Sequence, residues 1–490
     1  MAALSTRPNP LKWTGGYYNR EPLWPKEPDI TIIKSLALKY LASELPTTLD
    51  LDSLQVEFFA QGGFNKLYSI SCSGHSTHYL LRVALPLVPY YRIESEAAVL
   101  SYLKENTSIP VARVVAWKSS AATDLGFEWI LLEKIEGVAL YDIWRKVPWE
   151  SKLEIVAALA PLLGQLRDHK FDRIGSLYFK GREIQPDPEH RSKFVCPTHD
   201  LLIDSLQIAE ESKDPISEEA SEQGGYVVGP ILDSLFYLNR RLYLPGNRGP
   251  FRTSREWMAA GLDIQMSWIR TGPLIKTLAN REDFNKDDWD SDGDEEAPKM
   301  EKLFNDYQDV VPEIFTAAEG VFPYVLRHHD LSLANILVNP DTYEITGIID
   351  WEKIQVVPEW KGSRFPKFLT DEMDFPWSFD EEPRIPTSAE YIQESEDHMS
   401  IVVEERDRWD DAILRQHYDE ALSRTRGEEQ FDGNTSNCAK TKREFKAMIL
   451  DVTDDVNSAR VWLERYSESK RVITESEQEI RDSLSSVELS

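Results

Sequence analysis

Cysteine is scarce in this chain, with three residues in 490: Cys72, Cys196 and Cys438. They lie far apart, so the sequence has neither the paired spacing of a disulfide framework nor the close pairs of a zinc site. Few cysteines without a framework are typical of a protein from a reducing compartment.

Long apolar runs are also lacking. No segment approaches the ~18 consecutive apolar residues that a transmembrane helix requires, so no membrane span is expected. The N-terminal segment has no long apolar stretch of a secretory signal, which leaves the cytoplasm as the expected location. It contains Arg7, Lys12 and Arg20 but no acidic residue before Glu21, so a mitochondrial transit peptide is the alternative.

Positive charge is in deficit, because 55 Lys and Arg face 84 Asp and Glu, and the net charge is −29. Such a surface repels a phosphate backbone, which argues against nucleic acid as a partner. It is compatible with a cationic small-molecule substrate. Hydrophobic residues at 41% and aromatic residues at 11% are typical of a globular protein.

One stretch, residues 324–352, concentrates the polar residues that can carry chemistry. Asp330 is followed after four residues by Asn335, then by two short apolar runs around a Pro-Asp turn, and then by Asp350. The runs have strand composition, and their spacing predicts a β-hairpin with a longer loop. Such a hairpin would return Asp350 to the vicinity of Asn335 and Asp330.

Two carboxylates and a carboxamide at strand ends suit phosphoryl transfer. One carboxylate, Asp330, would position and deprotonate an attacking hydroxyl. Asn335 and Asp350 offer the oxygen ligands that Mg²⁺ prefers. His328 is expected to support the loop by bonding its backbone. Glu352 points to the same side as Asp350 on an extended chain and is a candidate for a second cation or a substrate amine.

The spacing H-x-D-x-x-x-x-N matches the protein-kinase catalytic loop, with I-D-W in place of D-F-G. In this form the chain resembles the aminoglycoside phosphotransferase and choline-kinase family, and more narrowly fungal proteins of that phosphotransferase type. The resemblance covers roughly residues 50–370. Shorter matches are I-G-S-L-Y-F ending at residue 179, and segments 228–231, 249–251 and 366–369.

This resemblance implies an α+β protein with a bilobal, protein-kinase-like fold, and ATP and Mg²⁺ as cofactors. Its small antiparallel β lobe would contain the short apolar segments 54–60, 66–72, 78–84, 110–117 and 128–134, with a helix over 91–104. The larger lobe would be helical.

The same resemblance assigns the nucleotide site. Gly62 and Gly63 would cover the phosphates, and backbone near Glu133 and Ile135 would pair with the adenine edge. Arg82 stands where kinases place a lysine, so a planar guanidinium would contact phosphate.

Helical geometry selects the partner of Arg82. At ~100° per residue, Glu96 lies nearer than Glu94 to the centre of the apolar stripe of helix 91–104. Glu96 is therefore expected to face inward and to orient Arg82.

Four regions are expected along the chain. An N-terminal arm and helix (1–50) precede the kinase-like N-lobe (51–135), the C-lobe (136–385) and a C-terminal helical extension with an acidic tail (386–490). Within the C-lobe, residues 282–301 hold ten acidic residues against two lysines and are expected to form a solvated loop.

The expected function is transfer of the γ-phosphate of ATP to a hydroxyl of a small molecule. A catalytically inert nucleotide-binding or scaffold module on the same fold is the alternative, and a protein kinase is a third hypothesis. The G-D-P-x-x-D-L segment usual in bacterial aminoglycoside kinases is lacking, which makes aminoglycosides themselves doubtful acceptors. The sequence leaves the oligomeric state open.

Overall fold

A computed structural model of the protein describes most of the chain. The described residues are 13–14, 21–42, 44, 50–180, 225–237, 241, 244, 246–278, 293–316, 323–361, 365–370, 397–426, 437–451 and 457–471. Residues 282–292 of the predicted acidic loop and the last 19 residues of the acidic tail (472–490) lie outside them.

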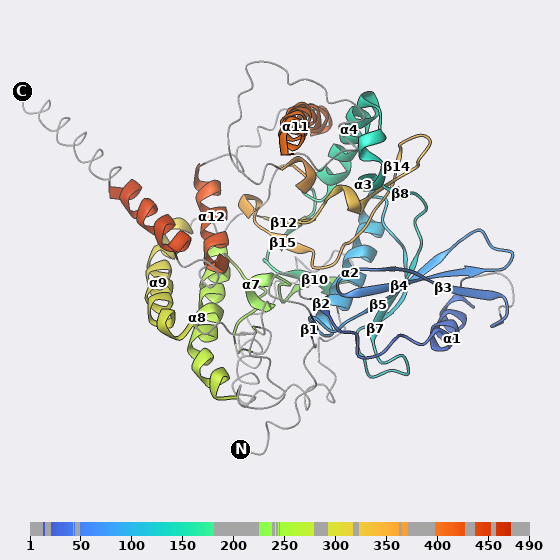
Figure 1. Cartoon of the computed structure of the whole chain (residues 1–490), viewed down its shortest axis with the longest axis horizontal. Coiled ribbons are helices and arrows are strands. Elements are labelled where there is room, and N and C mark those ends of the chain that lie inside the picture. Colours follow the sequence, from blue (N-terminus) through green and yellow to red (C-terminus); the bar gives the residue numbers. More distant parts are fainter. Residues whose placement is uncertain are drawn as a thin grey trace, which may run out of the picture.

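The small lobe is a five-stranded antiparallel sheet in the order β3-β4-β5-β7-β6 (Figure 1). Its elements are α1 (Ile30–Leu41), β3 (Leu54–Gln61), β4 (Asn65–Cys72), β5 (Tyr79–Ala84), α2 (Tyr91–Asn106), β6 (Val114–Lys118) and β7 (Glu128–Glu133). All five predicted strands are present, although β6 begins four residues after the predicted 110. In the N-terminal arm, before α1, strand β1 (Trp13–Thr14) pairs with β2 (Glu21–Pro22).

Two helices cover this sheet and join different cores. Helix α1 packs its buried residues Ile33, Ala37 and Leu41 into a core that belongs to the small lobe alone. Helix α2 instead contributes to a core that continues into the larger lobe and includes Leu326 and Ile348. Because α2 is shared in this way, the two lobes are held together next to the expected catalytic stretch.

The catalytic stretch forms parts of two small sheets. Its strands are β12 (Tyr324–Arg327), β13 (Ile336–Val338), β14 (Ile345–Ile348) and β15 (Gln355–Val357). The predicted hairpin is confirmed, since β13 pairs antiparallel with β14, and β8 (Val138–Ala139) adds a third strand. Strand β12 pairs with β15 on one side and with β9 (Lys170–Phe171) on the other.

Three of the four shorter sequence matches meet at one place in the larger lobe. Strand β10 (Ser176–Phe179) pairs with β11 (Tyr226–Gly229), and Ile174 bridges to Phe251. A Cβ built on Gly175 would lie 2.1 Å from the Gly229 carbonyl oxygen, so only glycine permits this close approach.

Helices make up the rest of the larger lobe. They are α3 (Leu140–Ile143), α4 (Trp149–Gln165), α7 (Ser234–Tyr237), α8 (Ser254–Leu278), α9 (Gly293–Ile314), α11 (Asp397–Arg426), α12 (Asn437–Asp451) and a helix over 457–471. Short 3-10 turns add η2 (Trp144–Lys146), η7 (Leu333–Asn335), η8 (Glu359–Lys361) and η9 (Lys367–Leu369). The α+β class with a small β lobe and a larger helical lobe is thereby confirmed. In the described part of the chain, no helix has the length and apolar character needed to cross a membrane.

One helical expectation needs correction. Residues 293–301 were expected in a loop but begin α9, whose later turns bury Leu303, Phe304 and Tyr307 in the core. The C-terminal helices are packed onto the larger lobe, α11 against α4 and α12 against α8 and α9 (Figure 1). The buried faces of these helices, rather than their local charge, fix their position.

Candidate active site

His328 directly follows β12 and joins the two halves of the catalytic stretch. Its ring is buried, its Nε2 lies 3.1 Å from the carbonyl oxygen of Ile349, and its ring centroid lies 4.7 Å from that of Trp351. Since a carbonyl can only accept, Nε2 carries the proton. Burial lowers the pKa of His328 to about 4, so the ring is neutral near pH 7. The expected support of the loop through a backbone bond is what this geometry provides.

Asn335 fixes the loop on which Asp330 lies. Its Nδ2 donates to the carbonyl oxygen of Asp330 at 2.8 Å, and its own carbonyl accepts from the amide of Ile349 at 2.9 Å. The residue before Asp350 is thus bonded to Asn335. The Asp330 carboxylate lies near enough to Asp350 to contribute to the rise of its pKa. The hairpin therefore brings Asp330, Asn335 and Asp350 together.

Asp350 has an unusual backbone. Its φ is +64°, in the left-handed region that residues with a Cβ rarely adopt. Its side chain is exposed, while Ile348 and Trp351 on either side are buried. Burial of the carboxyl group among surrounding atoms, followed by the charge of Glu352, raises its pKa. The turn thus presents a carboxylate whose negative charge is only partly compensated.

The donor atoms at this place suit Mg²⁺. Among the described residues, nothing donates a hydrogen bond to Asn335 Oδ1 or to the Asp350 carboxylate. Amide and carboxylate oxygens are the hard ligands that Mg²⁺ takes, usually together with phosphate oxygens of a nucleotide. No cluster of three or more His, Cys, Asp or Glu with metal-binding geometry occurs in the described ranges, so the protein alone offers no complete cage.

Arg82 and Glu96 form a buried ion pair. Arg82 lies on β5 between Leu67 of β4 and Ile130 of β7, and Glu96 reaches it from α2. Burial lowers the pKa of Arg82 to about 10, with Glu352 and Asp350 opposing the shift, so the guanidinium is charged at neutral pH. Arg82 is therefore held near the carboxylates of the catalytic stretch.

The position of Glu94 differs from the one that helical spacing predicts. It was expected to point away from the core, yet it is buried and accepts a hydrogen bond from Ser119 Oγ at 2.7 Å. Helix α2 packs on β6 and β7 with one side and on β10 with another, so residues around most of its circumference are covered. Both glutamates are inward, and only Glu96 pairs with Arg82.

The glycine loop lies between β3 and β4. A Cβ on Gly62 or Gly63 would meet no atom within 4 Å, so packing does not require glycine there. The Gly62 amide donates to the Asn65 carbonyl at 2.9 Å, which closes the turn. That amide is used within the hairpin, whereas the open space above the loop leaves room for a ligand.

In the expected hinge, some of the hydrogen-bonding groups are already paired within the protein. The Glu133 amide donates to the Arg113 carbonyl at 2.9 Å, and the Glu133 side chain pairs with Arg113 Nε at 3.1 Å. A Cβ built on Gly347 would lie 2.7 Å from the Ile135 side chain, so Ile135 is in contact with β14. The Glu133 amide is already hydrogen-bonded within the protein. Of these two residues, only Ile135 therefore has a backbone amide that could donate to an adenine edge.

Two contacts at the site were not anticipated. Glu352 pairs with the buried Arg92 of α2 at 2.7 Å and also accepts from Asn65 Nδ2 at 3.4 Å, so it ties the lobes together rather than remaining available for a second cation. Lys367 Nζ lies 2.8 Å from Asp330 Oδ1, and both side chains are about half exposed. The P-K-F-L match at 366–369 was the one sequence signal that pointed to Lys367.

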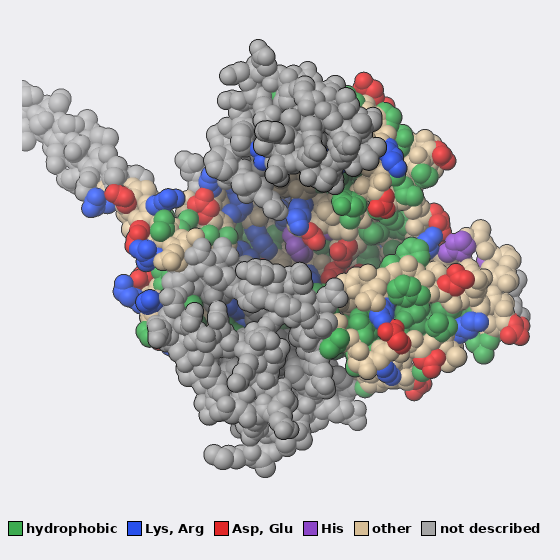
Figure 2. All heavy atoms as spheres, in the orientation of Figure 1, with side chains coloured by type: hydrophobic (Ala, Val, Ile, Leu, Met, Phe, Trp, Pro, Cys, Tyr) green, Lys and Arg blue, Asp and Glu red, His purple; other side chains and the backbone are tan. Residues whose placement is uncertain are grey.

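The molecular surface is hollowed on one face (Figure 2). Figure 2 shows a hollow in which a His side chain lies between Asp and Glu on one side and Lys and Arg on the other. The hollow lies where the small lobe meets the larger one (Figures 1 and 2). A bound nucleotide and an acceptor could therefore meet there.

Comparisons with known proteins find similarity to a phosphotransferase family. The model of the phosphotransferase enzyme family matches residues 65–358. A subtelomeric hrmA-associated cluster protein of Aspergillus fumigatus is 25% identical over 333 residues, which cover 67% of this chain and 62% of that protein. The mitochondrial protein named altered inheritance of mitochondria protein 9, from Meyerozyma guilliermondii, is 22% identical and is covered over 49% of its length. The chain thus spans less than two thirds of these relatives.

Solved structures of aminoglycoside phosphotransferases and of choline and ethanolamine kinases are also similar. The ethanolamine kinase of Plasmodium vivax is 16% identical, with a TM-score of 0.36, and the similarity covers 86% of this chain and 89% of that one.

Proposed function

The chain belongs to the phosphotransferase enzyme family, and we propose that it transfers the γ-phosphate of ATP to a hydroxyl group of a small molecule. The observation that carries this proposal is the convergence of Asp330, Asn335 and Asp350, which the Asn335 hydrogen bonds hold together. These are the residue types and the chain order that phosphoryl transfer requires.

Each residue has a separate task in this proposal. Asp330 accepts the proton of the attacking hydroxyl and orients it. Asn335 and Asp350 hold Mg²⁺, and Arg82, fixed by Glu96, binds a phosphate oxygen. When bound, Mg²⁺–ATP supplies the phosphoryl group and the metal charge that offsets its oxygens. His328 keeps the loop in place through the Ile349 carbonyl.

The electrostatics favour a Mg²⁺-bound nucleotide. Burial and the Glu352 charge raise the pKa of Asp350, which means that the ionised carboxylate is destabilised in the free protein. A divalent cation between Asn335 and Asp350 would remove that cost. Positioning and charge neutralisation, rather than covalent chemistry, then provide the rate acceleration.

An inert nucleotide-binding or scaffold module on the same fold is the second candidate. Two observations favour it: Arg82 replaces the usual lysine, and Lys367 pairs with Asp330. The ion pair is half exposed, so an acceptor could displace Lys367 from Asp330 at little cost.

A phosphorylation screen separates the two candidates. Purified protein is incubated with ATP, Mg²⁺ and a library of hydroxyl-containing metabolites, and ADP formation is followed, with Asp350→Asn as the control. We expect at least one acceptor to raise ADP formation by wild type and not by the variant. Equal, acceptor-independent turnover by both proteins would favour the scaffold.

The cellular location belongs to the same proposal. The cytoplasm remains our expectation, and the name of the Meyerozyma guilliermondii relative favours the mitochondrial alternative. Imaging of the protein with a C-terminal fluorescent tag against a mitochondrial stain distinguishes the two.

A further inference from the structure

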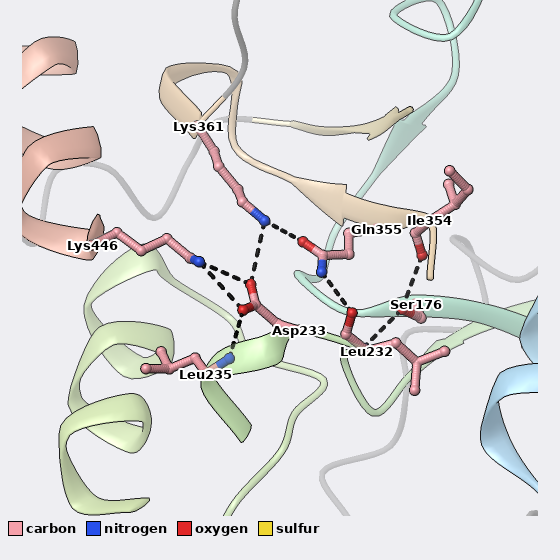
Figure 3. A network of polar contacts seen from close by, with 8 residues as sticks. All are labelled: Ser176, Leu232, Asp233, Leu235, Ile354, Gln355, Lys361 and Lys446. Atoms are coloured by element: carbon pink, nitrogen blue, oxygen red, sulfur yellow. Dashed lines mark hydrogen bonds and ion pairs between the residues drawn. The ribbon is translucent and has the colours of Figure 1, made fainter. Parts of the chain in front are cut away.

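A second group of charged residues lies in the larger lobe and has no role in the chemistry above. Asp233 is 3% exposed, and two lysines converge on it: Lys361 Nζ lies 3.3 Å and Lys446 Nζ 3.1 Å from Asp233 Oδ2 (Figure 3). They come from three separate elements, the start of α7, η8 and α12. Two lysines thus share one carboxylate, and burial lowers the pKa of Lys361 to about 7, so at neutral pH this lysine is charged only in part of the molecules.

The neighbouring groups hold this arrangement in place. The Leu235 amide donates to Asp233 Oδ1 at 3.0 Å, and Gln355 Oε1 accepts from Lys361 while its Nε2 donates to the Leu232 carbonyl (Figure 3). Both ammonium groups also lie over the ring of the buried Trp257, at 5.0 and 5.4 Å from its centroid. The lysine side chains remain 16% and 12% exposed, so neither is fully enclosed.

Strand pairing brings a further cation to the same face. Arg327 of β12 is the direct partner of Gln355 of β15, and paired residues of antiparallel strands project to the same side. Among the described residues, no carboxylate pairs with Arg327 and no side chain bonds its guanidinium. Burial lowers the pKa of Arg327 to about 10, and Arg167 and Arg443 add to the effect, so it stays charged at neutral pH.

A cavity lies beside Arg327. It has a volume of about 70 Å³ and is lined by Arg167, Arg327, His328, Leu331, Val357 and Tyr418, among others. Because about 10–15 Å³ suffices for one water, this cavity has room for a group of several heavy atoms beside Arg327, and neither Lys361 nor Lys446 lines it.

The cationic cluster borders the catalytic loop. His329 lies between them: although the residue is exposed, partial enclosure of its ring and then the Lys361 charge lower its pKa to about 3, and the next residue is Asp330. In the hollow of Figure 2, Lys and Arg gather on one side of a His and Asp and Glu on the other.

We propose that Arg327, Lys361 and Lys446 form a subsite that binds an anionic group, a carboxylate or a phosphate, of the acceptor whose hydroxyl is presented to Asp330. This inference rests on the proposed function and departs from the cationic acceptor with which the net charge of −29 is compatible. Uncompensated positive charge inside a protein is costly, and an anion removes that cost. A guanidinium also matches the two oxygens of either anion.

Binding of inorganic phosphate tests the subsite without turnover. Calorimetric titration is done with Mg²⁺ and a non-hydrolysable ATP analogue at saturation, so that the nucleotide site is filled. We expect phosphate to bind to wild type and to bind about tenfold more weakly to Arg327→Gln. Lys440→Met, on the same helix as Lys446 but exposed and paired with Glu444, should bind like wild type. Absence of binding to wild type, or equal binding to Arg327→Gln, would overturn the subsite.

Two further variants control for the possibility that a substitution prevents folding. Lys446→Met leaves Asp233 paired with one lysine, whereas the double variant Asp233→Asn/Lys446→Met keeps the net charge of the wild-type cluster. We expect weaker phosphate binding in both, and unchanged binding in the folded double variant would contradict the proposal.

Acceptor pairs that differ only in charge complete the test. Hydroxy acids and sugar phosphates are compared with the matching amides, esters and amino alcohols. We expect the anionic members to have KM values about tenfold lower, with the difference reduced in Arg327→Gln. Turnover restricted to cationic acceptors would refute the subsite and leave the kinase function standing. Phosphate binding without turnover of any acceptor would refute the kinase function and leave the anion site standing.

Discussion

Arg92 and Glu352 form a buried ion pair between residues 260 positions apart in the chain. The guanidinium of Arg92, in the first turn of α2, donates to one carboxylate oxygen of Glu352 through Nε at 3.0 Å and Nη2 at 2.7 Å. Burial raises the pKa of Glu352, yet the nearby Arg92 and Arg82 charges lower it to about 2, so Glu352 is ionised at neutral pH. The pair places the small lobe directly against the segment that carries Asp350.

Removal of one partner should destabilise the protein strongly. In Arg92→Met, Glu352 is left as a buried carboxylate with less compensation, which costs about 3–5 kcal/mol in other proteins. We expect a loss of this order in the free energy of unfolding from urea titration. Arg270→Met removes the exposed pair with Glu301 and should cost less than about 1 kcal/mol. Equal effects of the two variants would contradict a structural role for the Arg92–Glu352 pair.

Asn335→Ala should raise the Mg²⁺ requirement. The substitution removes one proposed metal oxygen and also the Nδ2 bond to the Asp330 carbonyl. We expect the Mg²⁺ concentration for half-maximal activity to rise about tenfold and the maximal rate to fall. Rates measured over a Mg²⁺ titration check this, and a rate that falls without any change in the Mg²⁺ dependence would speak against Asn335 as a ligand.

Arg82 can be tested by changing its shape and its charge separately. Arg82→Lys keeps a cation beside Glu96, whereas Arg82→Met removes it. We expect Arg82→Lys to retain activity within about tenfold and Arg82→Met to lose about a hundredfold or more, because the phosphate loses a charged donor. If both variants kept wild-type rates, the phosphate would have to be bound elsewhere.

Stability should depend on pH through Glu128. This residue is 2% exposed, it accepts from the Tyr90 amide at 2.9 Å, and burial raises its pKa to about 8. Between the unfolded pKa near 4.5 and pH 8, the folded protein holds a proton that the unfolded chain has released. The free energy of unfolding therefore falls as the pH rises through this window.

The size of the effect follows from the same shift. From pH 6 to pH 8 we expect a loss on the order of 2 kcal/mol in wild type that is abolished in Glu128→Gln. Denaturation at the two pH values measures it, with Glu57→Gln, on the exposed side of β3, as the control that keeps the wild-type slope. A slope shared by wild type and Glu128→Gln would assign the pH dependence to other groups.

Local features were accessible from the sequence. The hairpin of β13 and β14 follows from two apolar runs and a turn, and the inward position of Glu96 follows from helical geometry. The family expected from residues 324–352 is confirmed by the match over residues 65–358. The roles of Asp330, Asn335 and Asp350 remain predictions.

The features that sequence reasoning did not find depend on distant contacts. Glu94 is buried because β10, far along the chain, covers α2. Lys446 approaches Asp233 across 213 positions, and no local pattern records such a contact. The helix that begins at Gly293 was hidden by its acidic first turns, since its described apolar contacts with the core begin at Met300.

The most direct test concerns Asp330. ATP consumption with Mg²⁺ and an identified acceptor is measured for wild type, for Asp330→Ala and for Asp341→Ala, which removes an exposed aspartate from the loop of the same hairpin. Loss of the catalytic base should lower kcat for Asp330→Ala by about a hundredfold or more, with Asp341→Ala close to wild type. Equal rates for all three proteins would contradict phosphoryl transfer at this site.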